Sequence, residues 1–325
     1  MTMEPAQVAQ VLAHLSQTIG RVVMGSEENL RHAFVAFMVR GHVLMEGVPG
    51  TGKTFLARCF ARCLGLDMRR VQCTPDLMPG DVVGANVFDF KTQTFTLTKG
   101  PVFTEFLLTD EINRTPPKTQ SALLEAMQER SVTIDGVTHP LSSRFMVVAT
   151  QNPVEHEGTY PLPEAQLDRF IFELRIDYPD VAEEQEIVRS TTSGGSDPVE
   201  PILSADQIVE IQQLVHRVPV ADQLIEYAVR LVRSSRPTDD LAPDYVRAMV
   251  NWGAGPRASQ FLILAGKARA ILHGRHSVSA EDIRAVAPPT LRHRIVINFH
   301  AEAESMTAEA LVQRLLEDIS RDGLV

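Results

Sequence analysis

The residues best suited to chemistry form a glycine-rich loop. The segment from Gly47 to Thr54 reads GVPGTGKT and matches the spacing G-x-x-x-x-G-K-[ST]. Glycines at these positions let backbone N–H groups turn inward around a polyphosphate, and the helix that follows contributes its positive N-terminal end. Lys53 can then reach the β- and γ-phosphates, while the Thr54 hydroxyl can ligate Mg²⁺. The loop therefore predicts a site for a nucleoside triphosphate with Mg²⁺.

The context of this loop argues against a chance match to a glycine-rich turn. It follows an apolar run directly and precedes a helical pattern, which is the junction that the motif requires. The residues that we expect to contact the nucleotide here are Gly47, Pro49, Gly50, Thr51, Gly52, Lys53, Thr54 and Phe55.

Two acidic residues follow another buried run of the sequence. The segment Phe106–Thr109 ends in Asp110 and Glu111. A carboxylate at the carboxyl edge of a parallel sheet, beside a phosphate loop, can hold Mg²⁺, so we assign this role to Asp110. Glu111 is suited to orient and deprotonate the attacking water. Adjacent acids at a solvated loop end are the alternative, which the preceding buried strand disfavours.

Two further polar residues extend the predicted site. Asn152 follows the apolar run Phe145–Thr150, where its amide could hold the lytic water and contact the γ-phosphate. Alone it would be a turn asparagine. Arg169, in the segment PEAQLDRF, could reach the nucleotide of a neighbouring subunit in a ring and stabilise charge on the transferring phosphoryl group. Its alternative is a salt bridge to Asp168 or Glu164.

Short apolar runs alternate with helical patterns in the first part of the chain. Runs that are nearly continuous in Val, Leu, Met and Phe are typical of strands buried on both faces of a parallel sheet. Their alternation with helical stretches such as Thr54–Leu64 and Pro117–Gln128 predicts an α/β domain. The predicted strands are His42–Glu46, Met68–Gln72, Phe106–Thr109, Phe145–Thr150 and Phe172–Ile176.

The pattern changes at Thr191–Pro201 (TTSGGSDPVEP), which is typical of a flexible linker. Beyond it the patterns are helical almost throughout, and Ser204 and Ser279 stand where helix starts favour polar caps. We therefore predict a nucleotide-binding α/β domain over residues 1–190, a linker over 191–201 and a small all-helical domain over 202–325. The helices predicted for this second domain are Ala205–Arg217, Ala221–Ser234, Pro243–Trp252, Ser259–Gly274, Ala280–Ala287 and Thr307–Ser320.

The composition excludes several classes of protein. An apolar fraction of 44% and a charged fraction of 22% over 325 residues are those of a globular chain of about two domains. The net charge of −10 disfavours non-specific binding to nucleic acid or anionic lipid. The sequence shows no signal peptide and no apolar run near the ~18 residues needed to span a bilayer. We therefore expect a soluble, cytoplasmic protein without membrane insertion.

The three cysteines are too few, and odd in number, for a disulfide framework. Cys59 and Cys63 lie four residues apart on a predicted helix, where they could hold a metal ion or pack in the core. No second pair of ligands lies nearby, and the neighbouring Phe60 and Leu64 are apolar, so we favour packing.

Several segments together resemble the MoxR family of AAA+ ATPases. They are GVPGTGKT, LLTDEINRTPPKTQSALLEAMQE, ATQNP, EGTYPLPEAQLDRF and GAGPRA, and they occur in this order over nearly the whole chain. The resemblance implies an αβα core with a helical lid, binding of ATP or ADP with Mg²⁺, and assembly into a nucleotide-dependent ring, a homohexamer. The matching residues are Lys53 and Thr54 for Walker A, Asp110 and Glu111 for Walker B, Asn152 for sensor 1 and Arg169 for the arginine finger.

Other matches to the family have plainer alternatives. Arg257, in GPRA at the start of a lid helix, matches sensor 2, and its alternative is a capping arginine. Val22, Val23 and Gly25 resemble the segment that packs against adenine, although apolar packing alone would explain the valines. The role of Arg114, in the segment DEINR, stays open.

Two insertions bear on what such a ring does. Glu129–Leu141 alternates around Asp135-Gly136, a strong hairpin signal, and resembles the hairpin that this branch of AAA+ proteins inserts before sensor 1. Thr74–Gly84 follows the second strand, where such rings face their central channel. This segment offers Leu77 and Met78 but lacks the aromatic residue usual in peptide-threading rings, which argues against processive unfolding. Leu77 and Met78 could equally be ordinary packing residues.

These residues predict an ATP-hydrolysing ring that remodels, matures or activates a protein partner. The resemblance implies chaperone-like action, often on proteins with von Willebrand factor A domains or on metal- and cofactor-containing enzymes. A DNA-remodelling motor is one alternative, because related ring helicases share the hairpin, but the acidic balance disfavours it. A nucleotide-switched scaffold is a second alternative, disfavoured by Glu111, Asn152 and Arg169. A metabolic kinase is a third, disfavoured by the lid and by the finger motif.

Overall fold

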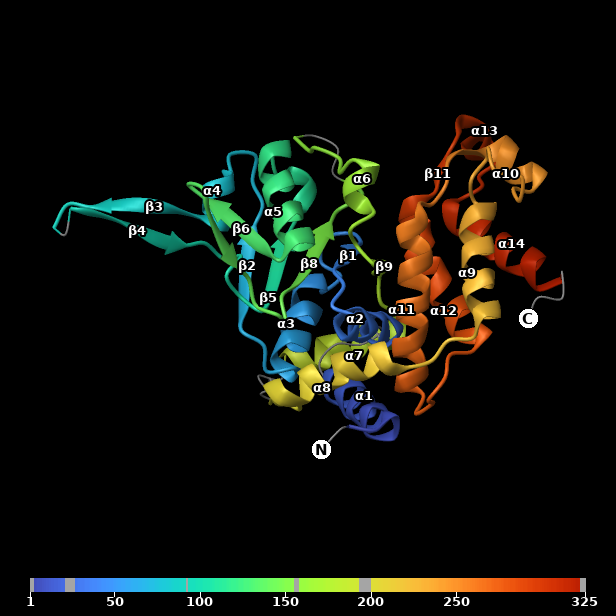
Figure 1. Cartoon of the computed structure of the whole chain (residues 1–325), viewed down its shortest axis with the longest axis horizontal. Helices are drawn as coiled ribbons and strands as arrows, with labels where there is room; N and C mark the ends of the chain where they lie inside the picture. The colour runs from blue at the N-terminus through green and yellow to red at the C-terminus, as the bar shows by residue number, and fades with distance from the viewer. Residues whose placement is uncertain (1–2, 21–26, 92, 155–157, 193–199, 322–325) are drawn as a thin grey trace.

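The computed structural model describes residues 3–20, 27–91, 93–154, 158–192 and 200–321. A sheet flanked by helices forms one side of the molecule, and a group of helices forms the other (Figure 1). Between them, helices α1 (Pro5–Gly20), α2 (Glu27–Met38) and α8 (Ala205–Arg217) lie beneath the sheet in this view. Val22, Val23 and Gly25, the residues predicted to pack against adenine, fall outside the described residues.

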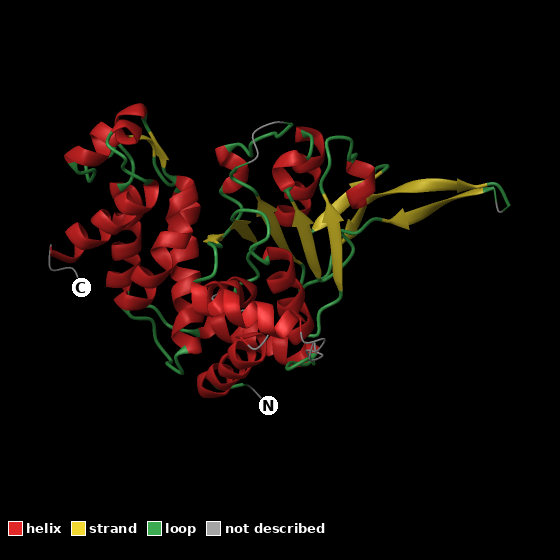
Figure 2. Ribbon diagram, turned by 180° about the vertical axis from the view of Figure 1, so that it is seen from behind, coloured by secondary structure: helices red, strands yellow, loops and turns green. Residues whose placement is uncertain are grey.

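The central sheet has five parallel strands in the order β2-β5-β8-β1-β9. Side chains alternate between its two faces. Along β5, Phe106 and Leu108 pack with α1, α2 and α3 (Lys53–Cys63), whereas Leu107 packs with α5 (Pro117–Glu129) on the opposite face. Figure 2 shows the strands between these helical layers. The strands are β1 (Val43–Glu46), β2 (Met68–Gln72), β5 (Phe106–Asp110), β8 (Met146–Gln151) and β9 (Phe172–Arg175), close to the predicted ranges.

The helical region shares its hydrophobic core with the sheet. One cluster of buried side chains runs from β1 and α3 to Leu262, Ile283 and Leu315. The amide of Gln212 on α8 donates to Phe37 O at 3.1 Å and ties α8 to α2. The remaining elements of this region are α9 (Asp222–Ser234), α10 (Asp244–Met249), β10 (Val250–Trp252), α11 (Pro256–Leu272), α12 (Ala280–Leu291), η2 (Arg292–Arg294), β11 (Val296–Ile297), α13 (Phe299–Ala303) and α14 (Ala308–Arg321).

Two element predictions need correction in this region. The helix predicted over Pro243–Trp252 ends at Met249, because β-branched Val250 turns extended and β10 pairs with β11. The helix predicted over Ala280–Ala287 continues through Pro288 and Pro289 to Leu291. Helix α7 (Val181–Thr192) extends into the predicted linker, of which residues 193–199 fall outside the described part of the chain. The predicted domain boundaries stay a prediction.

Two hairpins extend from the β2 side of the sheet. The hairpin β6 (Ser131–Ile134)–β7 (Val137–Pro140) lies within the predicted insertion. Its turn residues Asp135 and Gly136 have φ of 47° and 82°, as a type I′ turn requires. The hairpin β3 (Gly84–Asp89)–β4 (Thr94–Lys99) was not predicted and projects far from the rest of the molecule (Figures 1 and 2). Asn86 donates to Asp135 Oδ2 at 2.8 Å and links the two hairpins.

Shorter elements complete the core, and the cysteines lie inside it. They are α4 (Pro79–Val83), η1 (Ile112–Arg114) and α6 (Glu164–Leu167). Cys59 and Cys63 are buried free thiols in the cluster beneath the sheet, and burial raises the pKa of Cys63 to about 12. Among the described residues, no helix combines the length and apolar character needed to cross a membrane.

Candidate active site

The glycine-rich loop joins β1 to α3 at the carboxyl edge of the sheet. Gly50 and Gly52 have φ of 85° and 80°, a left-handed conformation that side chains disfavour. Gly47 is needed for another reason, because a Cβ there would lie 2.3 Å from Ile176 O. These glycines let the loop curl against β9 and begin α3 with free N–H groups at its first turn. An anion can bind at such a helix start.

Lys53 is folded over the carbonyl groups of the loop. Its Nζ donates to Gly47 O at 2.6 Å and to Val48 O at 2.7 Å. Burial lowers the pKa of this ammonium, and the carboxylates of Asp110 and Glu111 oppose the shift. The cation therefore already lies at the loop, within a rotation of the side chain of any anion bound there.

Asp110 is buried at the tip of β5 and lies beside the loop. The Thr54 hydroxyl is 3.2 Å from Asp110 Oδ1, and the Thr150 hydroxyl is also 3.2 Å from this oxygen. Arg70 Nε donates to Asp110 Oδ2 at 2.6 Å. A hydroxyl and a carboxylate converging on one point are the hard oxygen donors that Mg²⁺ prefers. The residues present therefore fit this ion, and Arg70 supplies the balancing positive charge in this structure.

Glu111 has a left-handed backbone, with φ of 59° and ψ of 51°. Its N–H donates to Thr150 Oγ1 at 2.9 Å, which fixes the turn after β5. The carboxylate accepts from Gln72 Nε2 at 3.1 Å and from Arg114 Nη1 at 3.1 Å. Two neighbours thus hold the side chain that we expect to act as the general base.

Asn152 is buried directly after β8, between the acidic tip of β5 and the loop that follows β1. Its Oδ1 accepts from Val154 N at 3.2 Å. The structure therefore brings the loop, Asp110, Glu111 and Asn152 together at one edge of the sheet.

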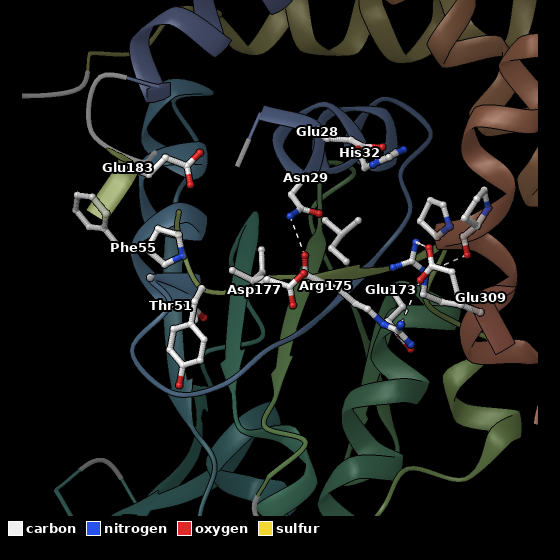
Figure 3. Close-up of a pocket in the computed structure, with 18 of the residues that line it drawn as sticks. Glu28, Asn29, His32, Thr51, Phe55, Glu173, Arg175, Asp177, Glu183 and Glu309 are labelled. Atoms are coloured by element: carbon white, nitrogen blue, oxygen red, sulfur yellow. Dashed lines mark hydrogen bonds and ion pairs between the residues drawn. The ribbon is translucent and has the colours of Figure 1, made fainter. Parts of the chain in front are cut away.

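A cavity of about 670 Å³ adjoins the loop and lies between the core and the helical region. It contacts the loop at Gly50, Thr51 and Gly52, and Phe55 also lines it. Figure 3 shows Thr51 and Phe55 at one end and Glu173 and Glu309 at the other. The cavity has the size of a cofactor or nucleotide site.

Charged side chains from both parts of the molecule line the far end of this cavity. Arg175 Nη1 lies 3.2 Å from Glu309 Oε2, and Arg292 Nη2 lies 3.0 Å from Glu309 Oε1. Burial, reinforced by Glu46, raises the pKa of Glu173 to about 6. These ion pairs join β9 to η2 and α14, so the helical region forms one wall of the cavity.

Arg169 and Arg257 lie apart from the loop, near each other in space. Arg169 Nη1 donates to Leu124 O at 2.6 Å, rather than to Asp168 or Glu164, and its Nε is buried without a hydrogen-bond partner among the described residues. Arg257 Nη1 pairs with Asp168 Oδ2 at 3.0 Å. Neither arginine is among the described residues that line the cavity.

Sequence reasoning missed four residues of this arrangement: Arg70, Gln72, Thr150 and Arg294. The strand register contains the signal for Gln72, since it lies opposite Asp110 at the tip of the neighbouring strand. Thr150 was counted only as the end of a predicted strand. The contact of Arg294 with Asp168 spans 126 positions of the sequence, and no local pattern indicates it.

Comparison with known proteins identifies the family. Residues 42–172 match the profile described as the ATPase family associated with various cellular activities (AAA), and residues 244–315 match the AAA lid domain. The chain is 42% identical over 303 residues to the chaperone MoxR1 of Mycobacterium tuberculosis, covering 93% of this chain and 80% of that protein. It is 33% identical over 301 residues to protein MoxR of Methylorubrum extorquens, with 88% and 87% covered. The chain belongs to the MoxR family of AAA+ ATPases.

A solved structure supports the same assignment. The crystal structure of a candidate ATPase from Cytophaga hutchinsonii matches with a TM-score of 0.89 and 37% identity, over 96% of this chain and 95% of that one. The resemblance to the MoxR family and the predicted fold class, an α/β core with a parallel sheet and a helical lid, are therefore confirmed. The roles predicted for individual site residues stay predictions.

Proposed function

We propose that this MoxR-family chain binds ATP with Mg²⁺ and hydrolyses it to ADP and phosphate. The observation that carries the proposal is the convergence of Lys53, Thr54, Asp110, Glu111 and Asn152 at one sheet edge. The adjoining cavity of about 670 Å³ supplies room for the base and ribose. Membership of an ATPase family supports the same activity.

The chain's own groups divide the work of phosphoryl transfer. The loop N–H groups and Lys53 bind the phosphates, the Thr54 hydroxyl and Asp110 carboxylate would hold Mg²⁺, and Asn152 orients the attacking water. Bound Mg²⁺ neutralises negative charge on the phosphate oxygens. Glu111 accepts a proton from the water as the water oxygen attacks the γ-phosphorus, and the bond from this phosphorus to the bridging oxygen breaks, so that ADP leaves with the electron pair. Gln72 and Arg114 both donate to Oε2 of this carboxylate, so Oε1 can accept the proton while they hold the side chain.

We further propose a ring, a homohexamer, in which each site takes Arg169 and Arg257 from the neighbouring subunit. Both arginines lie beside Asp168 rather than at the cavity of their own chain. Arg169 is half-buried, and its Nε has no hydrogen-bond partner among the described residues, so rotation of the side chain toward a neighbour's phosphate would give up its hydrogen bond to Leu124 O. The name of MoxR1 as a chaperone supports a remodelling role for such a ring.

The client is a protein, and the β3–β4 hairpin is the element that we assign to contact it. Phe90 and Phe95 are 86% and 71% exposed, and both belong to a cluster of rings with Phe88. Thr74–Gly84 itself offers no aromatic residue, whereas the adjacent hairpin carries Phe88, Phe90 and Phe95, which supports contact with a client at the hairpin. Proteins with a von Willebrand factor A domain and metal- or cofactor-containing enzymes in the cytoplasm are the clients that we propose.

A trapping experiment tests both the reaction and the client. Glu111→Gln in the presence of ATP should bind nucleotide, fail to release phosphate and retain a client protein that the wild type releases. Lys53→Ala is the matched control, because it should capture no client. Wild-type protein without ATPase activity would favour the nucleotide-switched scaffold, and salt-sensitive binding of DNA would favour the DNA motor.

A further inference from the structure

The turn η2 connects the helical lid to the segment that carries Arg169. Within η2, Arg294 is buried and donates from Nε to Asp168 Oδ1 at 2.8 Å. Its Nη2 donates to Asp168 O at 2.9 Å and to Phe170 O at 2.6 Å. His293 Nε2 lies 3.1 Å from the same carbonyl of Phe170. The residues on both sides of Arg169 are therefore fixed by the lid.

These contacts form a rigid support. Hydrogen bonds between a guanidinium and a carboxylate are stronger than neutral ones, and the planar fork of arginine fixes their directions. Burial lowers the pKa of Arg294 to about 10, with Asp168 opposing the shift, so the side chain stays charged at neutral pH. Nη1 also contacts Thr290 O at the end of α12, which anchors the guanidinium within its own domain.

The other end of the same turn borders the nucleotide cavity. Arg292, two residues before Arg294, lines the cavity and donates to Glu309 on α14. Three consecutive residues thus connect the wall of one subunit's cavity with the backbone around its Arg169. A lid that shifts when the cavity fills would carry this backbone with it.

We propose that Arg294 is a positioning residue that holds Arg169 in place for the active site of the neighbouring subunit. The inference rests on the proposed function, in which Arg169 acts across a subunit interface. Arg294 touches no nucleotide itself and acts through the Asp168–Phe170 segment. Its loss should therefore impair the site of the neighbour and spare the site of its own chain.

Mixing of variants tests this asymmetry. Arg294→Lys keeps the charge but loses the fork, so it should bind ATP normally and hydrolyse it at least tenfold more slowly. Mixed with Glu111→Gln, it should recover activity, because its intact Glu111 can then use a well-placed Arg169 from the other variant. Mixed with Arg169→Ala, it should recover none, because neither variant supplies a well-placed Arg169.

A matched control separates positioning from general stability. Arg275 is another lid arginine, paired with buried Asp282 at 2.8 Å within the lid. Arg275→Lys should lower the thermal unfolding temperature and leave ATPase activity near wild type. Should Arg294→Lys fail to fold, Asp168→Asn removes the carboxylate partner of both Arg294 and Arg257 and should give the same mixing pattern. Arg257→Ala is then measured beside it, and a larger loss of activity in Asp168→Asn than in Arg257→Ala reports on Arg294.

The mixing results distinguish two failures. The positioning role alone is overturned if ATPase activity returns when Arg169→Ala is mixed with Glu111→Gln but not when Arg294→Lys is mixed with Glu111→Gln. Failure of Arg169→Ala with Glu111→Gln to recover, although the two co-assemble, overturns the shared site and the inference with it.

Discussion

Glu111 occupies a position at which backbone and side chain are both constrained. Its left-handed φ of 59° is uncommon for a residue with a side chain. The hydrogen bond from its N–H to Thr150 compensates for this conformation, and Gln72 and Arg114 hold the carboxylate. Strain of this kind gathers at functional sites. Substitutions that change single functional groups of the site should therefore have separable effects on ATP binding and on turnover.

Lys53→Ala and Glu111→Gln should affect different steps. Removing the loop cation should weaken ATP binding by about 1.5–3 kcal/mol, roughly 10- to 150-fold. Glu111→Gln keeps the shape but removes the base, so binding should persist while turnover falls by roughly 10²–10⁴. Fluorescent-nucleotide titration and phosphate release measure the two steps. Lys118→Ala, at an exposed position on α5, is the control for lysine removal. Turnover near wild type in Glu111→Gln would remove this residue from catalysis.

His42 should make the free energy of unfolding depend on pH. Val147 N donates to its Nδ1 at 2.9 Å, and Nε2 lies 3.1 Å from Met127 O, so the buried ring is neutral. Burial, with Arg130, lowers the pKa of His42 to about 3. Below about pH 6.5 the His42 imidazole takes up a proton in the unfolded chain, whereas the buried ring of the folded protein stays neutral. The contribution of His42 to the free energy of unfolding is therefore complete above about pH 6.5. It declines by about 1.4 kcal/mol per pH unit as the pH falls toward 3.

The measurement is urea unfolding of the wild type and of His42→Gln between pH 7 and pH 4.5. The variant should be less stable at pH 7, where it loses a buried hydrogen bond, but its stability should fall less steeply on acidification. Glu173, with its raised pKa of about 6, contributes in the opposite sense, since its share falls as pH rises from 4.5 through 6. It is common to both proteins and cancels in the difference. Parallel pH profiles would contradict the assignment.

The individual contacts of the site were only partly predictable. The loop and the two acids could be predicted from the spacing of their residues, because phosphate binding requires glycines and a lysine at fixed positions. Arg70 and Gln72 could not be predicted in this way, since polar residues on an edge strand cannot be told from ordinary surface residues until the strand register is known. The pairing of Arg257 with Asp168 and of Arg294 with the same carboxylate depends on how the lid packs, which no local pattern contains.

At the scale of elements, buried structure was more predictable than exposed structure. The strands of the central sheet lie close to their predicted ranges because burial on both faces makes their apolar runs continuous. The β3–β4 hairpin was missed because most of its residues are exposed and its turn lacks the two-residue Asn-Gly or Asp-Gly signal. Strand β10 was missed because pairing with β11 overrides the helical pattern of the preceding residues.

Leu77 and Met78 should separate packing from surface contact. Leu77 packs against the cluster above the sheet, whereas Met78 is 68% exposed. Leu77→Ser should lower the free energy of unfolding by about 1–3 kcal/mol and reduce ATPase activity with it. Met78→Ser should leave both near wild type and lower client activation if the side chain faces the client. Thermal unfolding and an ATPase assay on each variant decide between the roles. Loss of stability in Met78→Ser would assign that residue to packing.

The aromatic hairpin should serve the client rather than the chemistry. Phe90→Ser combined with Phe95→Ser removes two exposed rings far from Glu111. Basal ATPase activity should stay within about twofold, because surface substitutions away from special features have small effects. Retention of a client by the Glu111→Gln background should be lost. Thr96→Ser on the same hairpin is the matched control. Unchanged client retention would show that the client binds elsewhere.

At the scale of the whole molecule, ATPase activity should require residues from two neighbouring subunits. Arg169→Ala and Glu111→Gln should each be inactive, since an arginine finger is worth roughly 10³–10⁵ in rate in well-studied cases. In an equal mixture, roughly a quarter of the interfaces in a cyclic ring join an intact Glu111 to an intact Arg169. Part of the activity should therefore return on mixing and decline on dilution as the ring dissociates.

Doping wild type with a small fraction of Arg169→Ala provides the control for this experiment. A loss of activity in proportion to the variant indicates that the sites are independent, and a steeper loss indicates that the sites hydrolyse ATP cooperatively. Absence of recovery in the mixture, despite co-assembly measured by light scattering, would place Arg169 in its own subunit's site.

The exposed rings of the β3–β4 hairpin also set conditions for handling the protein. Two-stranded arms with exposed aromatic rings can pair with one another, and like charge on the molecules opposes their approach. The net charge of −10 supplies that repulsion at neutral pH. Acidification neutralises carboxylates, and concentrated salt shortens the range of repulsion to about 3 Å at 1 M. We expect precipitation to begin at the hairpins under either condition, so purification should proceed at neutral or higher pH and moderate ionic strength.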